Sequence, residues 1–146
     1  MPWVEFLRWI WRGKSARRAL LNIELIKNAA VKGIVLDVGG KGKPSYQQVL
    51  PGINKTAWVV LDIMAGEGVS VRGDIAFQPF KKEMFDFIIC FNVLEHIYDF
   101  RAALGEMQRV LKPNGILYGC VPFICNVHAD PSDYWRFTGD CLKRNL

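Results

Sequence analysis

Residues that could hold a ligand follow the first two apolar runs of the chain. The run Ile34–Val38 leads into Asp37-Val38-Gly39-Gly40-Lys41-Gly42-Lys43-Pro44, and the run Ala57–Asp62 ends in an acidic residue. Glycines directly after a strand let the backbone turn sharply and approach a ligand closely. An aspartate about 20 residues further on can accept hydrogen bonds from both ribose hydroxyls of an adenosine group. Together these two signals favour a nucleoside-type cofactor over a plain turn.

The glycine segment also decides between kinds of cofactor. Gly40-x-Gly42-x-x-Ser45 imitates the dinucleotide pattern GxGxxG, but its third position is serine. Pro44 removes one of the backbone N–H groups that a pyrophosphate needs at a helix N-terminus. The segment therefore favours a cofactor without a pyrophosphate, and a nicotinamide oxidoreductase is disfavoured.

The elements that would position these residues follow an α/β order. Short apolar runs of this kind suit parallel strands that are buried on both faces. A helix between the last two runs carries Phe100, Leu104, Met107 and Leu111 on one face, with Asp99 as its N-cap and Lys112-Pro113-Asn114-Gly115 at its end. The pattern predicts an α/β, Rossmann-like, mostly parallel sheet of about five strands. The expected strands are Ile34–Val38, Ala57–Asp62, the weaker Val69–Val71, Phe85–Phe91 and Ile116–Val121.

Composition and charge divide the chain into two parts. Its 146 residues, 51% hydrophobic and 23% charged, suit one globular domain, and no apolar run is long enough for a membrane span. The net charge of +5 comes from residues 1–33, while residues 34–146 are neutral. We therefore expect a basic helical leader over 1–33 and one domain over 34–146. A neutral domain gives no support for nucleic-acid binding.

The leader is predicted to contain two helices. The first carries Trp3, Trp9 and Trp11 among charged residues, and the second runs from Ser15 to Ala30 and is closed by Gly33. We favour packing of both helices on the domain's own surface. The alternative is an interfacial helix, with residues 1–18 lying on an anionic membrane or a partner.

The spacing of the four cysteines favours free thiols over a metal or disulfide role. None of them stands in a CxxC arrangement, and two lie within apolar strand-like runs. Buried, reduced thiols in a cytoplasmic protein are the expected state. The four residues are Cys90, Cys120, Cys125 and Cys141.

Several segments, in order and spacing, resemble the class I S-adenosylmethionine-dependent methyltransferases, in the subgroup called methyltransferase type 11. The similarity covers about residues 34–146. A stretch from His128 to Thr138 is similar to an HxxPxDYWRFT signature of one branch of these enzymes. The other matching segments are LDVGGKGKPSY (36–46), VVLDI (59–63), GDIAFQPF (73–80), FDFIICFNVLEHI (85–97) and RVLKPNGILYGCVPF (109–123).

The resemblance implies S-adenosylmethionine as the cofactor and a role for each matching residue. Asp37, Gly39, Gly40 and Gly42 would face the methionine end of the cofactor. Asp62 would bind the ribose hydroxyls, and Ile63 would pack beside the adenine. The adenine amino group would donate to Asp74, with the Ile75 backbone nearby, and Phe91 and Asn92 would lie under the sulfonium. Lys41 and Lys43 depart from the commoner glycine-rich form of this loop.

A methyl acceptor with a hydroxyl or amine group can need a general base. His128 follows the fifth strand, where open α/β sheets bind substrates, so it is the candidate catalytic residue, as base or as acceptor contact. His96 is expected to satisfy a hydrogen bond at the start of the next helix instead. For Tyr134, Trp135 and Arg136 the structural alternative is an aromatic plug, with Thr138 capping the final helix.

These observations predict methyl transfer from S-adenosylmethionine to a small-molecule or glycan-type acceptor. The alternative is a non-catalytic, cofactor-binding or truncated pseudo-methyltransferase module. The resemblance implies seven strands in the order 3-2-1-4-5-7-6, but only residues 122–146 follow the fifth strand here. Strands six and seven are therefore expected to be missing. The fifth strand would then be an edge at which the chain could self-associate.

Overall fold

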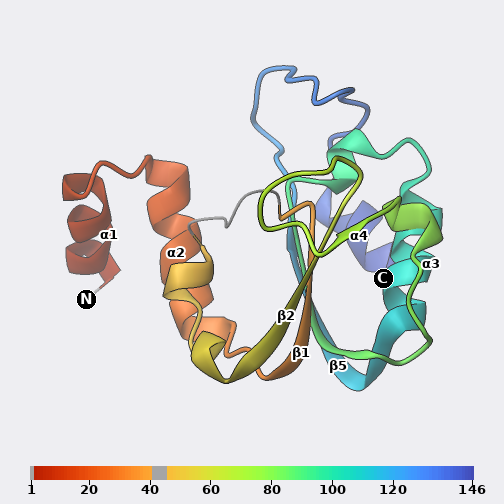
Figure 1. Cartoon of the computed structure of the whole chain (residues 1–146). Coiled ribbons are helices and arrows are strands. Elements are labelled where there is room, and N and C mark those ends of the chain that lie inside the picture. Colours follow the sequence, from red (N-terminus) through yellow and green to blue (C-terminus); the bar gives the residue numbers. More distant parts are fainter. Residues whose placement is uncertain (1, 41–45) are drawn as a thin grey trace.

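Five parallel strands form a single sheet in the order β3-β2-β1-β4-β5 (Figure 1). The computed structural model describes residues 2–40 and 46–146. Each neighbouring pair is parallel, which confirms the expected α/β, Rossmann-like architecture. The strands are β1 (Gly33–Val38), β2 (Thr56–Asp62), β3 (Val71–Arg72), β4 (Phe85–Phe91) and β5 (Leu111–Cys120).

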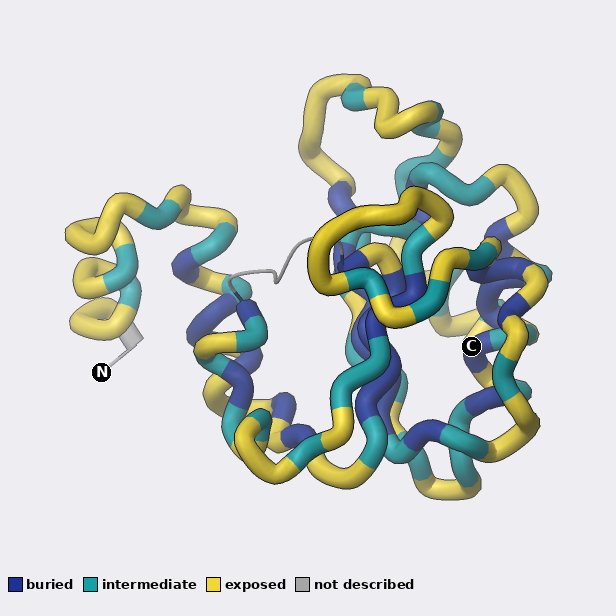
Figure 2. The backbone as a smooth tube through the Cα atoms, in the orientation of Figure 1, coloured by how far each residue is buried: buried dark blue, intermediate teal, exposed yellow. Residues whose placement is uncertain are grey.

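Helices cover both faces of this sheet. Helix α2 (Ala16–Asn28) packs Leu25 against Val35 and Phe87 on one face. Helix α3 (Phe100–Val110) packs Leu104 against the other face, where α4 (Gly139–Asn145) also lies. The buried residues follow the strands through the centre of the molecule (Figure 2). Helix α2 therefore packs on the sheet and supplies part of this core. The expected division of the chain into a leader (1–33) and a domain (34–146) stays a prediction.

Two strands differ from the expected ranges. Strand β3 covers Val71–Arg72, whereas the sequence predicted a strand over Val69–Val71. Ser70 precedes the strand: its N–H donates to the Val60 carbonyl, and its hydroxyl oxygen accepts from the Val60 N–H. Strand β5 begins at Leu111 and includes the segment that was expected to end α3 and form a turn. Its register with β4 shifts between Phe85 and Phe87, because residues 112–115 have no partner in β4 and Asn114 among them has a φ of +62°.

The helix ends follow from local side-chain caps. The Asp99 carboxylate accepts from the Ala102 N–H at 3.1 Å, as expected for the N-cap of α3. Ser15 caps α2 in the same way, but α2 ends at Asn28, before the expected Ala30. The final helix is capped by Thr138, which accepts from the Cys141 N–H, as the sequence predicts.

Helix α1 (Pro2–Trp11) lies beside α2 and away from the sheet (Figure 1). Its apolar side chains are largely exposed, Trp11 to 92%. The preferred interpretation, in which this helix packs its apolar face on the domain, is therefore wrong for these side chains. No helix among residues 2–40 and 46–146 is long and apolar enough to cross a membrane.

A carboxylic acid lies inside the core at the end of β1. Asp37 is fully buried, and its Oδ1 accepts from the Tyr46 hydroxyl at 2.7 Å while its Oδ2 accepts from Gln47 Nε2 at 3.2 Å. Burial disfavours the charged form and raises the pKa of Asp37 to about 6, against the opposing effect of side-chain donors that include Tyr46 and Gln47. The folded protein therefore holds this proton at pH values where the unfolded chain has released it.

Asp37→Asn should gain stability relative to the wild type as the pH rises from 4 to 7, by about 2 kcal/mol. Because the pKa of Asp37 is higher in the folded protein than in the unfolded chain, the carboxyl group stabilises the wild type at a pH below its unfolded-state pKa. This stabilisation is lost as the pH rises through the folded-state pKa of about 6. Urea unfolding at several pH values measures the difference. Asp140→Asn, at an exposed position, is the matched control, and equal pH profiles for wild type and Asp37→Asn would contradict the prediction.

Candidate functional site

The loops after β1, β2 and β4 meet at the carboxyl edge of the sheet. Gly39 has a φ of +69°, and its N–H donates to the Leu61 carbonyl at 2.8 Å, so the turn after β1 is fastened to β2. A Cβ at Gly39 would lie 2.4 Å from Val93 Cγ2. One at Gly40 would lie 2.4 Å from Asp37 Oδ2. These close approaches need glycine, while Gly42 lies outside the described residues.

Asp37 lies beneath this turn instead of lining an open site. Both of its carboxylate oxygens face donors of the following segment, Tyr46 and Gln47. The Tyr46 ring also packs edge-on against Phe91 at the end of β4, with 4.9 Å between ring centres. Asp37 thus joins the two ends of the turn after β1, and a role toward the methionine end of a cofactor stays a prediction.

Asp62 lies at the end of β2 and is partly exposed. Its Oδ1 accepts from the Met64 N–H at 2.8 Å, a local turn that holds the carboxylate in place. Among the described residues no donor contacts its Oδ2. Ile63 and Met64, the next two residues, are 56% and 55% exposed. A carboxylate followed by exposed apolar side chains suits a sugar hydroxyl beside a flat apolar ring.

Asp74 repeats this arrangement after β3. Its Oδ1 accepts from the Ala76 N–H at 2.8 Å and caps a short 3-10 helix, η3 (Ile75–Phe77). Within residues 2–40 and 46–146, its Oδ2 likewise has no protein donor. The Ile75 side chain is buried in the core, so only its backbone could face a ligand, as the resemblance implies.

Phe91 and Asn92 end β4 at the same edge. Phe91 is buried between Tyr46 and Tyr118, whereas Asn92 is partly exposed and adopts a φ of +52°. The Asn92 N–H donates to the Cys120 carbonyl at 2.9 Å, so this turn is tied to the end of β5. The left-handed conformation redirects the chain from the strand into the 3-10 helix η4 (Leu94–His96).

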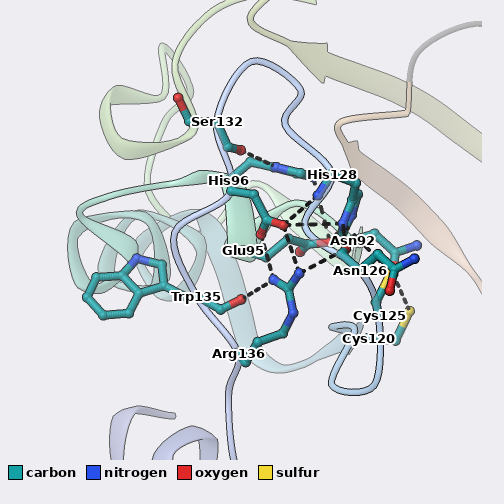
Figure 3. A network of polar contacts seen from close by, with 11 residues as sticks. Asn92, Glu95, His96, Cys120, Cys125, Asn126, His128, Ser132, Trp135 and Arg136 are labelled. Carbon is teal, nitrogen blue, oxygen red and sulfur yellow. Dashed lines mark hydrogen bonds and ion pairs between the residues drawn. The ribbon is translucent and has the colours of Figure 1, made fainter.

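A second group of polar side chains lies beyond Asn92 (Figure 3). Glu95 Oε1 lies 3.8 Å from His96 Nε2 and 3.9 Å from His128 Nε2, and the two imidazole rings pack edge to face. Burial raises the pKa of Glu95, although the two histidines oppose this effect. The sequence analysis did not select Glu95; the available signal was an acidic residue beside His96 after a buried strand.

The expectation for His96 was wrong. Asp99 caps α3, while His96 Nδ1 lies within hydrogen-bond distance of the Ser132 carbonyl. His128 is partly exposed after β5, as expected, and its backbone N–H donates to Asp133 Oδ2 at 2.8 Å.

The segment after β5 is held by an ion pair and an aromatic cluster. Arg136 donates from both terminal nitrogens to the two oxygens of Asp133, and this pairing lowers the pKa of that carboxyl. Trp135 packs against Phe100 and Phe137 and donates from Nε1 to the Ile97 carbonyl at 3.0 Å. The aromatic plug expected for this stretch is confirmed.

The cysteines are free thiols that differ in exposure. Cys90 is buried in β4, and burial raises its pKa. Cys120 and Cys141 are partly buried, but Cys125 is exposed in the segment after β5, so the expectation of burial was wrong for that residue.

Comparison with known proteins agrees with this geometry. Residues 57–119 match the family described as "Methyltransferase domain" (Methyltransf_11). The chain is 30% identical over 80 residues to the polyketide synthase ThaQ of Burkholderia thailandensis, covering 51% of this chain and 4% of that protein. It is 46% identical over 47 residues to the uncharacterized protein MJ0638 of Methanocaldococcus jannaschii, covering 32% and 20%.

Solved structures share the fold. One from Bacillus halodurans, described as a candidate methyltransferase, has a TM-score of 0.55 and 25% identity, covering 66% of this chain and 48% of its own. The cyclase SpnF has a TM-score of 0.65 and 21% identity, covering 91% and 57%. The chain thus spans small parts of the curated relatives and about half of these structures. Residues 57–119 thus match the methyltransferase type 11 family, and the chain has the fold of the class I enzymes whose cofactor is S-adenosylmethionine.

Proposed function

We propose that this chain binds S-adenosylmethionine and transfers its methyl group to an acceptor. The proposal depends mainly on Asp62, a partly exposed carboxylate at the end of β2 with Oδ1 fixed by the Met64 N–H. An ionised carboxylate has about four acceptor positions, so Asp62 can still accept from two hydroxyls. Ile63 and Phe77, which follow Asp62 and Asp74 in the sequence, are exposed and offer apolar surface for an adenine ring.

The residues at the carboxyl edge would divide the work of binding. The Gly39–Gly40 turn would lie along the methionine part, Asp74 would accept from the adenine amino group, and Asn92 would lie under the sulfonium. The cofactor supplies an already activated methyl group, so positioning the acceptor provides most of the rate. His128, exposed at the same edge, is proposed to contact the acceptor or to take its proton.

A small molecule or a glycan is the proposed acceptor class. The similarity to part of a polyketide synthase supports a small-molecule acceptor. The alternative is a module that binds the cofactor without turnover; the similarity to SpnF extends only to the fold, but it shows that this fold also serves a cyclase. A cytoplasmic location is part of the same proposal, and nucleic acid is not proposed as a partner.

Asp62→Ala should weaken binding of S-adenosylhomocysteine about tenfold or more, because each charge-assisted hydrogen bond to a hydroxyl contributes about 1.5–3 kcal/mol. Isothermal titration calorimetry measures the affinity, with NAD titrated in parallel. Asp140→Ala removes the same charge from α4 and should bind as the wild type does. A folded Asp62→Ala protein with unchanged affinity would refute the assignment, and tight NAD binding would favour an oxidoreductase.

Helix α1 is proposed to lie on an anionic membrane surface. Its exposed Trp3, Leu7 and Trp11 side chains are accompanied by Arg8 and Arg12, and basic residues continue into α2. The full chain should therefore sediment with vesicles containing phosphatidylserine and be released by high salt. Trp3→Ala/Trp11→Ala should lose this binding with little change in thermal midpoint. Equal sedimentation of the variant, or none by the wild type, would contradict the proposal.

The outer edge of β5 is proposed as a site of self-association. No described strand pairs with this edge, and Ile116 on β5 is substantially exposed. Unpaired strand edges promote association unless they are covered. Light scattering should show dimers or larger species, and amide exchange over residues 116–120 should slow as the protein concentration rises. Concentration-independent exchange in a strictly monomeric protein would oppose this.

A further inference from the structure

Three potential metal ligands converge on one point beside the end of β4 (Figure 3). Glu95 and His96 come from η4, and His128 comes from the segment after β5. One oxygen or nitrogen from each residue lies within 4.8 Å of the others. The chain has two histidines, and both belong to this cluster.

The neighbours of each imidazole ring indicate which of its two nitrogens carries the proton. His96 Nδ1 lies against the Ser132 carbonyl, and His128 Nδ1 lies 3.1 Å from the Asn126 carbonyl. Asp133 Oδ2 is also 3.3 Å from His128 Nδ1. Carbonyl and ionised carboxylate oxygens can only accept, so in each neutral ring Nδ1 carries the proton. Nε2 then presents a lone pair toward Glu95, the form in which histidine binds metals.

Glu95 completes the arrangement with two oxygens that lack donors. Its side chain is 0% exposed, and neither Oε1 nor Oε2 accepts a hydrogen bond within the described structure. A buried carboxylate without a partner is costly, so it must take up a proton or face a cation. Oε1 lies 3.8 and 3.9 Å from the two imidazole Nε2 atoms that present lone pairs. When Glu95 is ionised, its oxygens and the two Nε2 atoms are all acceptors, which is the arrangement that a bound cation would satisfy.

We propose that Glu95, His96 and His128 bind one divalent transition-metal ion, with Zn²⁺ as the best match to two imidazoles and one carboxylate. Ligand atoms about 2.1 Å from a tetrahedral zinc ion lie roughly 3.4 Å from one another. The separations from Oε1 to the two Nε2 atoms are 3.8 and 3.9 Å, and all three ligand atoms lie within 4.8 Å of one another, so binding would draw them closer together. The carbonyls of Ser132 and Asn126 would orient the two rings, as outer-shell acceptors do at metal sites.

The site would keep one coordination position open toward solvent. Glu95 is fully buried, but the His128 side chain is 40% exposed, so water or an acceptor oxygen can approach from that side. An ion with three protein ligands lowers the pKa of a bound water or hydroxyl oxygen. This role toward an acceptor rests on the proposed methyl transfer, whereas binding of the ion does not. It also assigns His128 the role of ligand in place of general base.

Zinc titration of the tag-free full chain, treated with EDTA and dialysed, tests the site by isothermal titration calorimetry. We expect one ion per chain. Glu95→Gln and His128→Gln should each weaken binding about tenfold or more, since each removes one of three ligands. Glu24→Gln, on the exposed surface of α2, and Cys125→Ser, beside His128, are the matched controls and should bind as the wild type does. His128→Gln alters a partly exposed residue, so it tests the proposal even if Glu95→Gln fails to fold.

X-ray absorption at the zinc edge gives an independent readout. Nitrogen and oxygen ligands at about 2.0–2.1 Å are expected, without sulfur at about 2.3 Å. Sulfur scattering, loss of affinity only in Cys125→Ser, wild-type affinity in both ligand variants, or no zinc binding by the wild type would each overturn the proposal. These measurements use no S-adenosylmethionine. A negative result for zinc would therefore leave the proposal of cofactor binding through Asp62 intact, and a negative result for the cofactor would leave the zinc site intact.

Discussion

Strand β1 pairs in parallel with β2 on one side and with β4 on the other, so its backbone hydrogen bonds are shared between both neighbours. Parallel pairing with this registry brings the ends of β1, β2 and β4 to one edge of the sheet. This pairing brings three residues of the candidate site to the same edge, because each lies at or just after the end of a strand: Gly39, Asp62 and Asn92. The helices then bury the two faces, which leaves this edge as the place where polar side chains gather.

The strands with continuous apolar runs could be predicted closely. Phe85–Phe91 matches β4, and β1 and β2 each begin one residue earlier than expected, because a strand buried on both faces has an unambiguous sequence. Strand β5 could not be bounded in this way. Lys112-Pro113-Asn114-Gly115 has the composition of a turn, and these four residues have no pairing partner in β4 although they lie within the bounds of β5. Asn114 has a φ of +62°, so the local preference for a turn is kept, and what the sequence did not show is that strand pairing resumes on both sides of it.

The polar residues were predicted where their role is local and missed where it is not. Asp99 and Thr138 act within three residues of themselves, so spacing alone identifies them as caps. His96 and Glu95 depend on His128 and Ser132, more than 30 residues away in the sequence. The segment LEHI alone does not indicate which distant residues its side chains will contact. The exposure of Trp3 and Trp11 could not be predicted either, because it depends on where α1 leaves the domain.

The segment after β5 is attached to η4 through its backbone. The N–H groups of Tyr134 and Trp135 both donate to the Glu95 carbonyl, at 2.8 and 3.2 Å, and Trp135 Nε1 donates to the carbonyl of Ile97. The two segments are thereby held as one unit, although a whole strand and a helix separate them in the sequence. A molecule that contacts this unit therefore meets two segments that are already fastened together, and its binding does not have to offset the conformational entropy of bringing them together.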